Sequence, residues 1–152
     1  DSSYVAMEHG FIYLYAIIDV YSRYIVGWGL YNSFDASNAI EVLDAVVRRH
    51  GAPERIISNH GCKYTSKEWH EVCEGHGIKI SMDGKARCLD NIWIERFWRT
   101  KKREYVYLNP EDNVIALRKG VARYIDYYNN RRYHQGIDHQ IPAARYAAAI
   151  AA

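Results

Sequence analysis

Two short runs of β-branched and aromatic residues, joined by only five residues, restrict the fold of this chain more than any other feature. The runs cover residues 11–18 and 24–31, and their composition is typical of strands. A link over residues 19–23 suits an antiparallel hairpin and is too short for the crossover helix that parallel neighbours need. The chain therefore predicts an antiparallel sheet near its start, with residues 1–5 as a further strand.

After Asp35 the spacing of apolar residues changes to a helical period. The first stripe ends near Gly51 and consists of Ala36, Ile40, Leu43 and Val47. Residues 65–68 fit a capping box that opens a second helix, with Gly77 as its stop. The inward face of that helix is expected to carry Trp69, Val72, Cys73 and His76. Residues 55–58 and 78–82, on either side of it, predict two brief strands.

Two further helices are predicted in the last part of the chain. One covers residues 89–107, and Asn109-Pro110 fits the N-cap and first position of the other. The inward residues of the last helix are Val114, Leu117, Val121, Tyr124 and Tyr128. This order of strands and helices predicts one α/β domain over residues 1–152, with a mixed sheet covered by helices.

The composition is that of an ordinary globular domain, with 152 residues, 49% hydrophobic and 25% charged. It excludes a disordered tail, a collagen-like repeat and a disulfide mini-protein. The three Cys include no C-x-x-C pair, so we expect free thiols in a reducing compartment and no structural zinc. No apolar run approaches the ~20 residues that span a bilayer. The interpretation is a cytoplasmic protein without a membrane partner.

Charge is distributed unevenly along the chain. Residues 1–84 hold 7 Lys and Arg against 11 Asp and Glu, whereas residues 85–152 hold 13 against 7. The second part therefore predicts a face that binds a polyanion, although solvated charged helices would give the same counts.

The predicted helix over residues 89–107 places charged and apolar residues on opposite sides. At about 100° per residue, its polar face carries Asn91, Glu95, Arg99 and Lys102. The opposite side carries Leu89, Trp93, Phe97 and Thr100. Residues 59–61 follow the strand 55–58, where an open α/β sheet places its binding loops. The pattern suits a metal site beside a phosphate-bearing polymer, and equally a solvated helix face.

The segments Ser58-Asn59-His60-Gly61 and Asp90-Asn91-Ile92-Trp93-Ile94-Glu95 belong to longer motifs that resemble those of bacterial insertion-sequence transposases with a retroviral-integrase-like core. Residues 58–66 read Ser-Asn-His-Gly-Cys-Lys-Tyr-Thr-Ser and are similar to that family's Ser-Asp-x-Gly-x-x-Tyr-Thr-Ser motif. Residues 90–95 read Asp-Asn-Ile-Trp-Ile-Glu and are similar to its Asp-Asn-x-x-x-Glu motif. Residues 1–5, 18–28, 81–85, 128–134 and 141–143 follow the family in the same order. The resemblance implies a ribonuclease-H-like fold with a five-stranded mixed sheet flanked by helices.

The resemblance also implies a catalytic triad of two Asp and one Glu. Asp1 and Glu95 fall on the first and last positions, and 35 residues separate Asn59 from Glu95, as in the family. These three residues are the expected catalytic and metal-binding set for Mg²⁺ or Mn²⁺, with two ions in an intact family member. Asn59 departs from the pattern because an amide replaces the second carboxylate. The loss of that charge predicts an inactive or weakly active form.

Other residues have a structural interpretation beside a functional one. Asp19 suits a hairpin turn better than a metal site, and Asp35 and Asp90 suit helix N-caps. The expected DNA contacts are Lys85, Arg87, Arg99 and Lys102. His134 is expected to contact either DNA or the last helix.

The function implied by the resemblance is DNA transposition through metal-dependent strand cleavage and strand transfer. The expected partners are DNA, at element ends and target, and further copies of the chain in a homo-oligomer associated with the bacterial nucleoid. Recognition of element ends is expected to need a separate domain. A non-catalytic DNA- or protein-binding module of the same fold and a nuclease for RNA–DNA hybrids are the alternatives.

Overall fold

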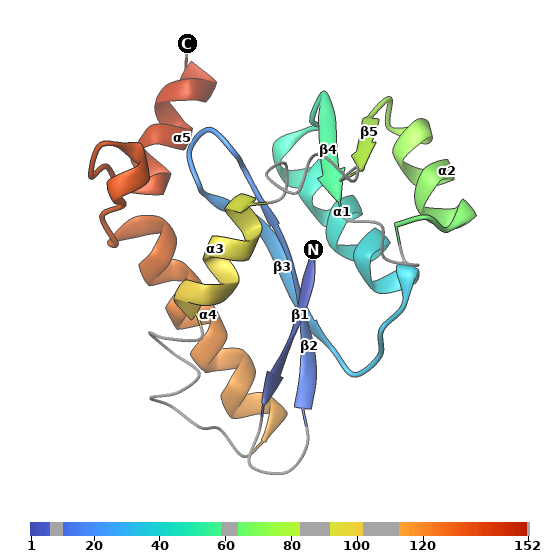
Figure 1. Cartoon of the computed structure of the whole chain (residues 1–152), viewed down its shortest axis with the longest axis horizontal. Helices are drawn as coiled ribbons and strands as arrows, with labels where there is room; N and C mark the ends of the chain where they lie inside the picture. Colours follow the sequence, from blue (N-terminus) through green and yellow to red (C-terminus); the bar gives the residue numbers. More distant parts are fainter. Residues whose placement is uncertain (7–10, 59–63, 83–91, 102–112, 152) are drawn as a thin grey trace.

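The computed structural model describes residues 1–6, 11–58, 64–82, 92–101 and 113–151. Its strands are β1 (Ser2–Ala6), β2 (Phe11–Ile18), β3 (Ile25–Tyr31), β4 (Arg55–Ser58) and β5 (Lys79–Met82). Its α-helices are α1 (Ala36–His50), α2 (Lys67–Gly75), α3 (Ile92–Lys101), α4 (Val114–Asn130) and α5 (Pro142–Ala151). Figure 1 shows β1, β2 and β3 in the middle, with α3, α4 and α5 on one side and α1 and α2 on the other. This is the predicted layered α/β arrangement.

The strands form antiparallel and parallel pairs, as the mixed sheet requires. β1 pairs with β2 and β2 with β3, all antiparallel, and β4 pairs with β5 in parallel. Within the described residues, however, hydrogen bonds assign a three-stranded sheet and a separate two-stranded sheet, not one five-stranded ladder. The backbone of Asp1, just before β1, pairs with β2: Asp1 and Ala16 exchange two backbone hydrogen bonds of 2.9 Å. A cavity of about 20 Å³, lined by residues of both sheets, lies in the seam between them.

Alternation along β2 produces two hydrophobic cores, one on each face of the central sheet. Leu14 and Ala16 are buried in a cluster with Phe97 of α3 and Leu117 of α4. Tyr15 points to the other face and joins a cluster with α1 and α2. Because successive side chains of a strand point to opposite sides, one strand supports both layers. The expected inward residues of α4 are buried except Val114, which is exposed.

The buried face of α1 differs from the predicted stripe. The residues that are buried are Ala39, Val42, Leu43 and Val46, whereas Ala36, Ile40 and Val47 of the predicted stripe are only partly buried. Both sets of residues have helical spacing, so the sequence alone allows either face to be buried. Packing of α1 against β3 determines which face is buried. At Gly27 of β3, a Cβ atom would collide with Val46, so the glycine allows α1 to lie close to the sheet on this side.

The side chains that cap α2 and α4 differ from the predicted ones. The N-cap of α2 is Ser66, whose hydroxyl accepts a hydrogen bond from the Trp69 N–H at 3.2 Å, and not Thr65. The α4 helix begins at Val114, where Asn113 is the N-cap and accepts from the Ala116 N–H at 2.8 Å, and the predicted start at Asn109-Pro110 lies outside the described residues. Asp35 holds the N-cap position of α1 without a side-chain bond. Gly77 has the positive φ of 71° expected at the stop of α2.

A buried asparagine attaches α4 to the central sheet. Asn129 accepts from the Ile25 N–H at 2.8 Å and donates to the Ile25 carbonyl at 3.0 Å. Its amide therefore completes the hydrogen bonding at the first residue of β3. The following segment returns to α4, where the ring of His134 packs edge-on against Tyr128 with centroids 4.5 Å apart. Of the two expected contacts of His134, DNA or the helix that is now α4, this ring contact supports the helix.

Candidate active site

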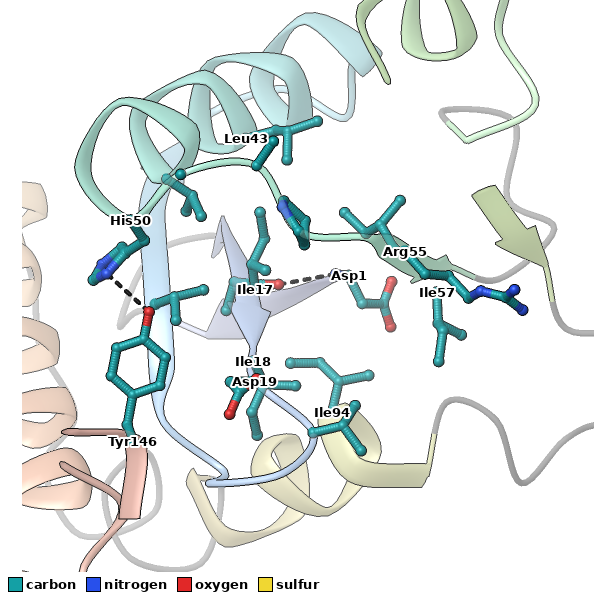
Figure 2. Close-up of a pocket in the computed structure, with 18 residues that line it drawn as sticks. Asp1, Ile17, Ile18, Asp19, Leu43, His50, Arg55, Ile57, Ile94 and Tyr146 are labelled. Carbon is teal, nitrogen blue, oxygen red and sulfur yellow. Dashed lines mark hydrogen bonds between the residues drawn. The ribbon is translucent and has the colours of Figure 1, made fainter. Parts of the chain in front are cut away.

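Asp1 lies at the seam between the two sheets, next to α3. Its backbone is fixed by Ala16, and its carboxylate Oδ2 accepts a long hydrogen bond of 3.4 Å from the Trp98 indole nitrogen. In Figure 2 the carboxylate lies between β4, which carries Ile57, and α3, which carries Ile94. An anionic oxygen pair is thus held in place where three elements meet.

The helical phase of α3 agrees with the prediction. Phe97 is 1% exposed and belongs to the core, whereas Glu95 and Arg99 are exposed. Glu95 follows Ile94, which lines the same cavity as Asp1, and precedes by one turn Trp98, which contacts Asp1. The carboxylate of Glu95 therefore projects from the helix that borders Asp1, on its solvent side. Trp98 was missing from the predicted site, although its place three residues after Glu95 was a signal available in the sequence.

The other predicted site residues fall largely outside the described part of the chain. These are Asn59, Lys85, Arg87 and Lys102, together with Asp90. Ser58, which directly precedes Asn59, is the last residue of β4 and is 2% exposed. The strand that leads to position 59 therefore ends beside Asp1, since both residues line the small seam cavity.

A larger cavity of about 360 Å³ opens beside Asp1. Figure 2 shows the side chains that line it, which come from β2, β3, β4, α1, α3 and α5 and are mostly aliphatic. At its far side the Tyr146 hydroxyl and His50 Nδ1 form a hydrogen bond of 3.0 Å. Tyr146 also stacks on Tyr24 with centroids 4.8 Å apart, and this joins α5 to the β2–β3 hairpin.

Asp19 also lines this cavity, but its carboxylate accepts hydrogen bonds within the β2–β3 turn. Oδ2 accepts hydrogen bonds from the N–H and the hydroxyl of Ser22 at 2.9 and 2.6 Å. These bonds close the turn between β2 and β3, which confirms the turn interpretation. Arg23, at the end of that turn, has a positive φ of 64°. Burial lowers the pKa of its guanidinium.

Tyr64 supports the seam from the α2 side. Its ring is 2% exposed and meets Trp69 edge-on with centroids 5.2 Å apart. Burial raises the pKa of the Tyr64 hydroxyl far above its usual value, so this group stays a neutral hydrogen-bonding partner. The free Cys73 lies in the same cluster, and burial raises its pKa to about 11. A protonated, buried thiol is a packing residue, not a metal ligand.

The predicted ligand set of Asp1, Asn59 and Glu95 has the donor chemistry that suits a hard divalent cation. Asp1 and Glu95 offer carboxylate oxygens and Asn59 an amide oxygen, which are ligand types that Mg²⁺ and Mn²⁺ prefer. Among the described residues, no group of three His, Cys, Asp or Glu is arranged to hold a metal. Asn59, the middle member of the predicted triad, lies outside these residues.

Solved structures share this fold over almost the whole chain. The human T-lymphotropic virus 2 integrase catalytic core in its dimeric form with magnesium matches with a TM-score of 0.73 and 16% identity, over 94% of this chain and 90% of that one. The catalytic core of bovine immunodeficiency virus integrase matches with a TM-score of 0.75 and 14% identity, over 97% and 92%. The fold is thus the ribonuclease-H-like fold of integrase catalytic cores.

Comparison of sequences gives the family. Two models described as "Integrase core domain" match residues 1–88 and 76–142, and the chain belongs to the integrase core domain family. The transposase for insertion sequence element IS904 of Lactococcus lactis is 31% identical, over 93% of this chain and 57% of that protein. The putative transposase InsK for element IS150 of Escherichia coli is 33% identical, over 80% and 44%. The resemblance to insertion-sequence transposases is therefore confirmed, and the chain spans about half the length of these relatives.

Proposed function

We propose that residues 1–152 are the catalytic core of an insertion-sequence transposase that cleaves and joins DNA strands. The observation that carries this proposal is the placement of Asp1 against α3, the helix that presents Glu95 to solvent. The hydrogen bond from Trp98 joins Asp1 to α3, and these two parts of the chain carry the two carboxylates of the predicted triad, Asp1 and Glu95. The relatives, which are transposases for insertion sequences, support the same reaction class.

Asp1, Asn59 and Glu95 are the proposed ligands of Mg²⁺ or Mn²⁺. Bound divalent ions supply activation of a water or a DNA 3′-hydroxyl and stabilisation of the leaving oxygen. In this proposal the chain holds and orients these ions through Asp1, whose backbone bonds Ala16 and whose carboxylate accepts a long hydrogen bond from the Trp98 indole. Arg99, one turn beyond Glu95 on the exposed side of α3, offers a cation to the DNA backbone.

Asn59 makes the present form weak or inactive in this proposal. An amide retains one coordinating oxygen but lacks the negative charge that offsets a divalent cation. Even a partner outside the ligand set typically contributes about 10–100-fold to metal affinity or activity. Loss of a ligand charge is expected to cost at least as much.

The test restores the carboxylate. We expect Asn59→Asp to produce nicking of DNA in Mg²⁺ or Mn²⁺, and to make the melting temperature rise with added metal. Without metal, the melting temperature should fall slightly or stay unchanged, because a third carboxylate adds like-charge repulsion. Glu95→Gln in the Asn59→Asp protein should abolish both metal effects. Glu74→Gln, an exposed carboxylate on α2, is the matched control and should preserve them.

The outcomes separate the catalytic proposal from its alternatives. Nicking together with metal-dependent melting supports the transposase core. Insensitivity to metal in both forms contradicts a ligand role for position 59 and favours a non-catalytic DNA- or protein-binding module. Preferential cleavage of RNA–DNA hybrids would instead indicate a nuclease of the same fold.

The partners follow from the same proposal. DNA at element ends and target would bind the basic part of the chain, and a homo-oligomer would bring two sites to the paired ends. The related solved structures include a dimeric and a trimeric form of one integrase core. No helix in the described part of the chain is long and apolar enough to cross a membrane. We propose that the protein acts on DNA in the bacterial cytoplasm.

A further inference from the structure

Two buried polar side chains at the seam between the sheets have no hydrogen-bond partner within the described part of the chain. Neither Ser58 Oγ nor Trp69 Nε1 finds a partner among the described residues, and both residues are only 2% exposed. Both residues line the cavity of about 20 Å³ that also touches Asp1. A buried polar atom without a partner is costly, so folded proteins rarely leave two of them at one place.

The size of the cavity fits one water molecule. A site needs about 10–15 Å³ of such volume and two or more polar partners to hold a buried water. A cavity of about 20 Å³ meets the first requirement, and the two lining residues Ser58 and Trp69 carry polar atoms that can meet the second. An additional side chain or a nucleotide would not fit in this volume.

We propose that a single water molecule occupies this cavity and bridges Ser58 Oγ to Trp69 Nε1. The indole can only donate, so the water accepts from Trp69. The Ser58 hydroxyl can both donate and accept, and the water donates to it. Both orphaned atoms are then satisfied through one molecule.

The bridge would connect elements that no backbone ladder joins. Ser58 ends β4, and Trp69 lies in the first turn of α2, where the Ser66 cap holds its backbone. In the described residues, β4 has no ladder hydrogen bonds to β1, the strand beside Asp1. Water therefore fixes the end of β4 at the residue before position 59. Ser58 and Trp69 are then positioning residues for position 59, whether or not the chain is catalytic.

A crystal structure that resolves buried waters tests the site directly. The expected result is a water peak within hydrogen-bonding distance of both Ser58 Oγ and Trp69 Nε1. The Trp98 indole, which donates to Asp1, is the internal control and should show no such bridge. An empty cavity with both side chains in their present positions overturns the proposal.

A double-mutant cycle tests the bridge in solution. We expect Ser58→Ala to lower the melting temperature by about 2–4 °C, the shift for one buried hydrogen bond in a domain of this size. In a Trp69→Phe background, where the water has lost its donor, Ser58→Ala should lower it by less than half as much. Equal shifts in both backgrounds, or a rise on Ser58→Ala alone, contradict the proposal. Should Trp69→Phe fail to fold, the crystal structure decides.

Discussion

Replacement of Asn129 by Ala should destabilise the domain strongly, because one side chain satisfies two buried backbone groups. The amide bonds the N–H and the carbonyl of Ile25 at 2.8 and 3.0 Å, and Asn129 is 5% exposed. The two residues are 104 positions apart in the sequence, so the pair joins α4 to β3. Loss of the amide leaves both groups of Ile25 buried and unpaired.

The magnitude follows from those two groups. An unsatisfied buried donor or acceptor costs about 1–3 kcal/mol, so Asn129→Ala should lower the free energy of unfolding by about 2–6 kcal/mol. That is a large part of the ~5–15 kcal/mol that stabilises a typical domain. Each kcal/mol lowers the melting temperature of a domain of this size by about 2–4 °C.

Urea and thermal unfolding measure this effect, with Asn130→Ala as the matched control. Asn130 is the next residue and is exposed, and its amide donates to Asp126 within the same helix. Its replacement should change the free energy by less than about 0.5 kcal/mol. Equal effects of the two substitutions would refute the role assigned to Asn129.

The substitution Asn129→Asp tests the accepting role and the donating role of the side chain separately. A carboxylate can still accept from the Ile25 N–H, but only the protonated acid can donate to the Ile25 carbonyl. Burial should raise the folded-state pKa of this Asp above its unfolded value of about 3.9. The stabilising bond is then fully present below the unfolded pKa and is lost as pH rises through the folded pKa. Asn129→Asp should therefore be closer to the original protein in stability at pH 4 than at pH 7.

Three further predictions follow from other parts of the structure. Burial raises the pKa of the Cys73 thiol to about 11 from 9.0. The stability that the protonated thiol contributes is therefore full below pH 9 and is lost as pH rises toward 11. Peptide mapping should find this thiol unlabelled by iodoacetamide in the native protein. Gly27→Ala should lower the free energy of unfolding by about 1–3 kcal/mol in urea titrations, because the new methyl group collides with Val46. Arg99→Ala with Lys102→Ala should weaken DNA binding similarly for all sequences and reduce the salt dependence by about two charges.

The DNA prediction has a matched control on another helix. Arg118 and Lys119 are exposed on α4 and carry the same two charges. Their replacement by Ala should leave the salt dependence closer to that of the original chain. A loss confined to one DNA sequence would indicate base recognition by α3, contrary to the phosphate contacts proposed.

The sequence determined the elements whose evidence is local. The strands 11–18 and 55–58 have the predicted bounds, and the turn at Asp19 follows from its short polar link. The exposure of Glu95 also follows from the sequence, because residues two positions apart in a helix point to roughly opposite sides and Phe97 is buried. The motif order identified the family without any coordinates.

The tertiary structure decided what depends on contacts between distant residues. The apolar pattern of α1 allows two stripes, and the close approach at Gly27 selects the one through Val46. The contact between Trp98 and Asp1 and the bonds between Asn129 and Ile25 join residues about a hundred positions apart. Local periodicity carries no information about such partners. Only the packed chain determines which polar atoms find partners and which, like Ser58 Oγ and Trp69 Nε1, have none within the described residues although their side chains border a cavity.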